Sequence, residues 1–212
     1  SANLADVVIV GTGTNILNVA ESYATSNVAS INNESSASLT INGSGTLQST
    51  IANSVMVRKY NTNTTTASNL TLSGDVTLTT VGRVISDNYS DAVTGGTITI
   101  KDNVSLLNSG TYTIDVNKAS TLNISGGTIE NSGTSANSYA IQSTDATTVN
   151  INGGTITGIQ SVIHISTGSS AVTISGTVIM TTTASAQPVI YHEGTGLLTI
   201  LGGTLTAEGA GA

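Results

Sequence analysis

The 212-residue chain contains no cysteine, no tryptophan, no phenylalanine and a single proline, Pro188. The absence of cysteine excludes disulfide bonds and cysteine-ligated metal sites. No stretch has the apolar spacing of an amphipathic helix, and no apolar run approaches the roughly 18 residues of a membrane-spanning helix. We therefore expect an almost entirely β structure without a transmembrane segment.

Charged residues are also scarce, at 8% of the chain, and 12 acidic residues outnumber five basic ones to give a net charge of −7. Binding to nucleic acid phosphates requires clustered cations. The only adjacent basic pair is Arg58-Lys59, which we expect on an exposed turn. The composition therefore argues against a nucleic acid partner, and no motif calls for a cofactor.

A short motif of alternating apolar and polar residues recurs along the chain, in all but one copy with a glycine at or near its end. Its eight copies begin at Val7, Leu39, Leu70, Ile98, Leu122, Val149, Val172 and Leu198, and the copy at Ile98 lacks the glycine. Successive copies begin 23 to 32 residues apart. A repeat of 20 to 50 residues is typical of a stacked solenoid.

Each repeat predicts three short strands separated by turns. The alternating motif is the first strand, a second alternating run follows the glycine turn, and a third apolar patch precedes the next copy. This order predicts a right-handed parallel β-helix of about eight coils, forming one domain over residues 1–212. A β-sandwich has short strands too, but it does not explain the in-phase recurrence. The expected inward side chains are Leu39, Ile41, Leu70, Leu72, Leu122, Ile124, Val149, Ile151, Val172 and Ile174.

Aligning the third strands gives the best polar constellation in the chain. Asp115, Gln142, His164 and Tyr191 fall into one outward column, and His192 stands beside it. These five residues form a candidate ligand surface, although a column of assorted surface residues is the ordinary alternative. Sugar hydrolysis needs converging carboxylates, and this column holds one acid and no lysine or arginine. We therefore predict no catalytic residues.

Two further patterns have structural interpretations. Asp75 and Asp102 follow equivalent strands and could share a hard cation, but two acids without other ligands more often serve only a turn, so no metal site is predicted. The Gly-Gly pairs, such as Gly153-Gly154, resemble a phosphate-binding loop. No helix follows them, so the anion-binding mechanism is missing and they are expected to be corners.

A polar stripe occupies the outward positions of the motif. Counting from Val8 in the first copy, it continues through Thr40, Thr71, Thr99, Asn123, Asn150, Thr173 and Thr199. Regular threonine arrays on solenoid faces resemble ice-binding proteins, although Lys101 and Leu201 interrupt the neighbouring outward positions. Threonine is also the ordinary residue of an exposed strand.

The segments I-S-G-G-T-I (124–129), I-N-G-G-T-I (151–156) and I-L-G-G-T-L (200–205), with strands such as Y-A-I-Q (139–142), resemble repeats of bacterial surface proteins. These proteins have a pectate-lyase-like right-handed β-helix and include adhesins and autotransporter passenger regions. The resemblance implies a secreted or cell-surface rod that mediates adhesion to a host or bacterial glycan or protein, without catalysis. A carbohydrate-binding or polysaccharide-degrading module is the alternative, and an ice-binding solenoid is the second. No site residue is carried over.

The ends of the chain carry a separate expectation. The chain begins with Ser1, and neither end contains an amphipathic helix or a polar segment that would cover the last coil. Solenoids need capped ends. We therefore expect a piece of a longer surface protein that associates weakly with itself, end to end or along the polar stripe.

Overall fold

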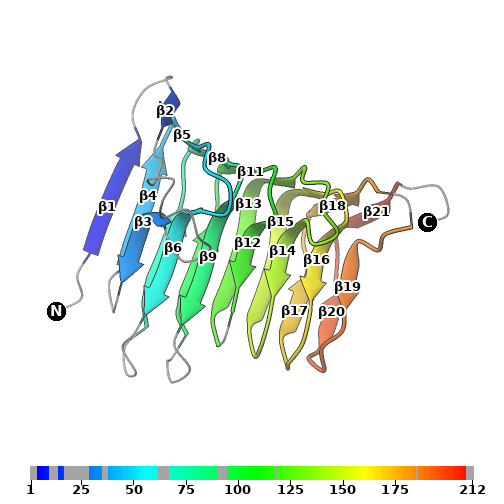
Figure 1. Ribbon diagram of the computed structural model, residues 1–212. Helices are drawn as coiled ribbons and strands as arrows, with labels where there is room; N and C mark the ends of the chain where they lie inside the picture. The colour runs from blue at the N-terminus through cyan, green and yellow to red at the C-terminus, as the bar shows by residue number, and fades with distance from the viewer. Residues whose placement is uncertain are drawn as a thin grey trace.

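The computed structural model describes residues 4–9, 14–16, 29–34, 38–61, 67–89, 95–117, 119–184 and 186–208. In these ranges the regular secondary structure consists of strands, without a helix. The strands stack side by side along one axis, from the N-terminal end of the rod to the C-terminal end (Figure 1). The chain is a parallel β-solenoid, which confirms the predicted fold class.

Three columns of parallel strands form the rod, and each column forms one face of it. The first face consists of β1 (Leu4–Ile9), β4 (Ser38–Gly43), β7 (Asn69–Leu72), β10 (Thr97–Ile100), β13 (Thr121–Asn131), β15 (Thr148–Gly158), β17 (Ala171–Ile174) and β20 (Leu198–Ile200). The second face consists of β2 (Thr14–Ile16), β5 (Thr46–Ser49), β8 (Thr77–Thr80), β11 (Ser105–Asn108), the second halves of β13 and β15, β18 (Ile179–Thr182) and β21 (Thr204–Ala207). The third face consists of β3 (Ala29–Glu34), β6 (Val55–Asn61), β9 (Arg83–Tyr89), β12 (Tyr112–Val116), β14 (Tyr139–Ser143), β16 (Ser161–Ile165) and β19 (Ile190–His192).

The core is built from ladders of aliphatic residues that stack in register from coil to coil. On the first face, Leu122 of β13 lies opposite Val149 of β15, and Ile124 lies opposite Ile151. Alternation along each strand turns these residues inward and their neighbours outward. All ten predicted inward residues are buried, so the sequence pattern identified the core of the first face correctly.

The Gly-Gly pairs are corners, as predicted. Gly127 and Gly154 have φ values of 82° and 91°, in the left-handed region that favours glycine. A Cβ atom on Gly154 would also lie 2.8 Å from the carbonyl oxygens of Gly126 and Gly127. Backbone conformation and the close approach of the preceding coil therefore both require glycine there.

Two details of the predicted repeat are corrected. The rod makes about six turns rather than eight coils. Eight copies of the motif enclose only seven full repeats. The first of these repeats contains residues 10–13 and 17–28, which lie outside the described residues. In the first copy, Val8 lies opposite Asn42 and Asp6 lies opposite Thr40, so the predicted stripe position of Val8 was wrong by two residues.

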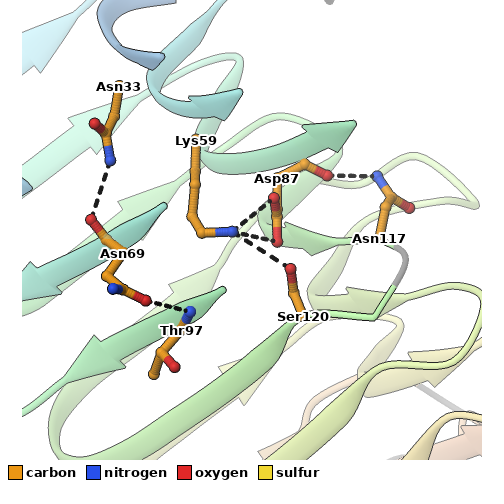
Figure 2. A network of polar contacts seen from close by, with 7 residues as sticks. All are labelled: Asn33, Lys59, Asn69, Asp87, Thr97, Asn117 and Ser120. Carbon is orange, nitrogen blue, oxygen red and sulfur yellow. Dashed lines mark hydrogen bonds and ion pairs between the residues drawn. The ribbon is translucent and has the colours of Figure 1, made fainter. Parts of the chain in front are cut away.

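The expected exposed turn at Arg58-Lys59 was also wrong. Both residues lie in β6, where Arg58 faces outward and the Lys59 side chain is fully buried. Lys59 lies opposite Asp87 of β9, and its Nζ atom is 3.2 Å from Asp87 Oδ1 (Figure 2). An acid at the equivalent position of the next coil therefore allows a lysine to occupy an inward position.

The last described coil leaves apolar residues exposed. Leu198 and Ile200 of β20 occupy inward positions, opposite the buried Val172 and Ile174 of β17. Ile200 is nevertheless 52% exposed, and the outward Leu201 is 74% exposed. In the described part of the chain, no further strand covers β20.

Replacement of a core residue should unfold the rod. In Ile151→Asp an unpaired carboxylate enters the ladder, at a cost of several kcal/mol, which is comparable with the whole stability of a typical domain. We expect loss of the β signal in far-ultraviolet circular dichroism. Asn152→Asp, at an exposed position of the same strand, is the matched control. A cooperative unfolding transition retained by Ile151→Asp would contradict the stacked core.

The exposed apolar residues of β20 should cause self-association. We expect sedimentation velocity of the 212-residue chain over a hundredfold concentration range to show a rising sedimentation coefficient, because contiguous exposed apolar surface favours contact. Ile200→Thr should reduce this association. Ile179→Thr removes an apolar side chain of similar exposure from the second face and should leave it unchanged. Monomers at every concentration would contradict the prediction.

Candidate functional site

The third face carries the predicted polar column on its outer side. Asp115 of β12 lies opposite Gln142 of β14, Gln142 opposite His164 of β16, and His164 opposite Tyr191 of β19. Towards the N-terminus the column continues through Ser86 and Arg58. The structure therefore brings together four of the five residues of the candidate ligand surface.

The fifth residue, His192, does not join them. It lies opposite the buried Ile165, on the inward side of β19, because adjacent residues of a strand face opposite ways. Its Nε2 atom is buried and has no hydrogen-bond partner among the described residues. The candidate ligand surface therefore consists of the other four residues, with neighbours that the sequence did not identify.

Arg83 is the first of these neighbours. Its guanidinium lies 3.2 Å from Asp115 Oδ2 and 5.1 Å from the centre of the Tyr112 ring. Burial raises the pKa of Asp115, while the positive charge of Arg83 and a hydrogen bond with Ser86 oppose that rise. The one acid of the predicted column is therefore already engaged by a cation, Arg83, which lies outside the column.

Aromatic rings connect successive coils next to this column. The Tyr112 and Tyr139 rings are stacked with centres 6.1 Å apart, Tyr139 lies 4.4 Å from the His164 ring, and His164 stacks on Tyr191 at 5.0 Å. The Tyr112–Tyr139 and His164–Tyr191 pairs are stacked, whereas the Tyr139 and His164 rings are tilted by 47°. These contacts between coils stabilise the rod, and Tyr191 at the end of the ladder is 43% exposed.

His164 lies at the centre of a hydrogen-bonded cluster. Its Nδ1 atom is 2.8 Å from Gln142 Oε1, and its Nε2 atom is 3.0 Å from Glu193 Oε2. The Tyr191 hydroxyl donates to Glu193 Oε1 at 3.0 Å. Hydrogen bonds from His164 and then Tyr191 hold the pKa of Glu193 below its usual value. This cluster contains groups that can donate and accept protons.

We refer to Arg83, Tyr112, Asp115, Tyr139, Gln142, His164, Tyr191 and Glu193 as the outer strip. It is least accessible at its centre, and it is most accessible at the C-terminal end of the rod. Asp115 and Gln142 are almost completely buried, whereas Tyr191 is 43% exposed and Glu193 is exposed. A ligand approaching the strip would therefore reach Tyr191 and Glu193 before the two buried side chains.

A groove adjoins the N-terminal end of the outer strip. It has a volume of about 340 Å³ and spans four coils at the corner between the second and third faces. Arg83 forms part of its wall, and the remaining lining is mainly small and polar: Asn53, Gly82, Ser109, Gly110, Thr134 and Ser135 among others. Hydroxyls, an amide and backbone groups of this kind can bind a hydroxyl-rich ligand.

The polar stripe of the first face is continuous and in register. Thr40 lies opposite Thr71, which lies opposite Thr99, and the series continues through Asn123, Asn150, Thr173 and Thr199. Asn150 Nδ2 donates to Asn123 Oδ1 at 3.0 Å. All predicted positions from Thr40 to Thr199 are therefore aligned, and only Val8, the position predicted for the first copy, is misaligned.

The two acids considered for a cation serve turns. Asp102 accepts a hydrogen bond from the Gly74 backbone N–H at 3.1 Å, and Asp75 accepts one from Asn103 Nδ2 at 2.8 Å. The described residues contain no group of three or more histidines, cysteines or acids that could hold a metal ion. The turn interpretation of Asp75 and Asp102 accounts for their contacts.

No protein-family model, curated protein or solved structure matches the chain. The similarity to bacterial surface β-helices therefore remains a resemblance of repeat segments on a parallel solenoid. In the part of the chain that the structure describes, no helix is long and apolar enough to cross a lipid bilayer.

Disruption of the Arg83–Asp115 pair should destabilise the rod. Arg83→Met leaves the buried Asp115 carboxylate without its cation, and we expect a loss of about 1–3 kcal/mol in the free energy of unfolding. The double variant Arg83→Met/Asp115→Asn removes the charge as well and should recover part of that loss. Urea denaturation measures both, with the exposed Lys101→Met as control. Equal stability of Arg83→Met and wild type would contradict a contribution from the pair.

Proposed function

We propose that the chain is a non-catalytic, adhesin-type rod of a bacterial surface protein, and that it presents the outer strip and the adjoining groove to a glycan or protein on another surface. The observation that supports this proposal most strongly is the combination of a groove lined by hydrogen-bonding groups with carboxylates that are already engaged. Such a surface can bind without performing chemistry.

The contacts of the acids argue against glycoside hydrolysis. That reaction needs one carboxyl group to protonate the leaving group and a second to attack the sugar or activate water. In the outer strip, Asp115 is paired with Arg83, and Glu193 is hydrogen-bonded to His164 and to the Tyr191 hydroxyl. Both acids of the strip are therefore engaged by other side chains.

A rod with a weakly charged, polar exterior also suits the proposed location. Only 8% of its residues are charged, and threonine, serine and asparagine make up 85 of 212. The resemblance to adhesins and autotransporter passenger regions supports the same proposal. A secreted or cell-surface location and a host or bacterial partner follow from this resemblance, while the groove supports a hydroxyl-rich glycan as ligand.

A glycan array combined with binding to whole cells tests this function. We expect the wild-type protein to bind a glycan, and Thr134→Trp, which fills the groove, to weaken binding at least tenfold. Thr173→Trp introduces the same bulky group on the first face and should bind normally. Absence of any glycan or cell binding by the wild-type protein, or equal binding by Thr134→Trp, would contradict the proposed surface.

The His164–Glu193–Tyr191 cluster favours a second candidate, a polysaccharide-degrading module, because proton transfer between such groups is the requirement of a lyase. Incubation with acidic polysaccharides distinguishes the two functions. Turnover that is abolished by His164→Ala would replace the adhesin proposal with an enzyme.

The in-register polar stripe favours ice binding as a third candidate. Thermal hysteresis of the wild-type protein that is lost in Thr173→Trp would support ice binding instead of adhesion. Thr173→Trp thus distinguishes a function of the first face from a function of the groove.

A further inference from the structure

The interior contains a lysine amine and a carboxyl group held against each other. Lys59 Nζ lies 3.2 Å from Asp87 Oδ1 and 3.3 Å from Asp87 Oδ2 (Figure 2). Both side chains are fully buried, between the third face and the first face. Because Nζ is nearly equidistant from the two oxygens, the carboxyl carbon that bears them lies next to the amine.

Register and packing fix this arrangement. Lys59 and Asp87 are directly opposite in the β6–β9 pair, and the backbone of Asp87 accepts a further hydrogen bond from Asn117 Nδ2 at 3.0 Å. Gly96 passes so close to the lysine stem that a Cβ atom there would lie 3.2 Å from Lys59 Cε. Positioning of reacting groups at about 3–3.5 Å can replace much of the entropic barrier of a reaction.

Burial also favours the reactive protonation states. Desolvation lowers the pKa of Lys59, against the opposing effect of Asp87, and it raises the pKa of Asp87 to about 7. A neutral amine is nucleophilic, and a protonated carboxyl group can lose its hydroxyl as water. Burial thus shifts both groups towards the uncharged forms that condense, while their mutual attraction opposes that shift.

We propose that Lys59 and Asp87 condense to an isopeptide bond that joins strands β6 and β9. The Nζ lone pair attacks Asp87 Cγ and forms the C–N bond. A proton from Nζ passes to the departing hydroxyl, the C–O bond breaks, and one water molecule leaves. The reaction changes no oxidation state and needs no co-reactant.

Ser120 is placed to carry the proton. Its Oγ atom lies 3.4 Å from Lys59 Nζ, and it forms a hydrogen bond with the Asp87 carboxyl group. A hydroxyl in this position can accept a proton from the amine while it donates its own to the leaving oxygen. The product is a neutral amide, which is less costly to bury than two charges. This inference does not rest on the proposed function.

Intact-mass spectrometry of the denatured wild-type protein tests the bond. We expect a mass below the sequence mass by one water molecule, and tandem spectrometry should find a branched peptide in which Lys59 is linked to Asp87. Wild-type protein that folds and has the full sequence mass would overturn the proposal, and the pair would then be an ion pair.

Matched variants exclude another source of water loss. Lys59→Met and Asp87→Ala should both have their full sequence mass, whether or not they fold. A water loss that persists in Lys59→Met would come from a cyclic imide elsewhere and would contradict the bond. Ser120→Ala should accumulate unlinked protein. Linkage at the wild-type rate in Ser120→Ala would remove the role of the hydroxyl.

Discussion

In-register parallel pairing between successive coils is the constraint on which this structure depends. Each residue lies opposite its equivalent one repeat away, so a side chain in the core meets the same position of the next coil about 4.8 Å away. Aliphatic residues satisfy this condition by stacking on aliphatic residues, as Ile124, Ile151 and Ile174 do. Loop lengths can vary between coils as long as the register of the strands is kept.

The same constraint determines how polar residues enter the interior. A lysine in the interior needs an acidic partner at the equivalent position of an adjacent coil, and Lys59 finds one in Asp87. Uncharged polar residues can instead bind the backbone at a corner. Asn131 does so, since its side-chain amide donates to the carbonyl oxygens of Thr111 and Tyr139 and accepts from the Gly133 N–H. The polar interior therefore follows the repeat as closely as the apolar interior does.

Features that recur in every coil, such as the alternating strands, could be predicted from the sequence because each copy supports the same interpretation. Contacts that occur only once were missed. Alternation identified the first face and aligned Asp115 with Gln142 before any contact was known. Lys59 was assigned to an exposed turn because a basic pair ordinarily lies in solvent, although its 28-residue separation from Asp87 equals the repeat between Leu70 and Ile98. Arg83 and Glu193 had no such signal, because both lie outside the aligned column and reach it through their side chains. The register of the first copy failed since Val7-Val8-Ile9-Val10 lacks alternation.

The aromatic ladder affects how a ligand could be recognised. Sugar-binding proteins commonly use an exposed ring face as an apolar platform, but here Tyr112 stacks on Tyr139 and His164 stacks on Tyr191. Stacking between coils therefore occupies one face of each of these rings, while Tyr191 at the end of the ladder is still 43% exposed. The other groups that the strip and the groove present are hydroxyls, amides and backbone groups. These bind a ligand through directional hydrogen bonds. Recognition at this surface would accordingly depend on the arrangement of ligand hydroxyl groups more than on ligand apolar area.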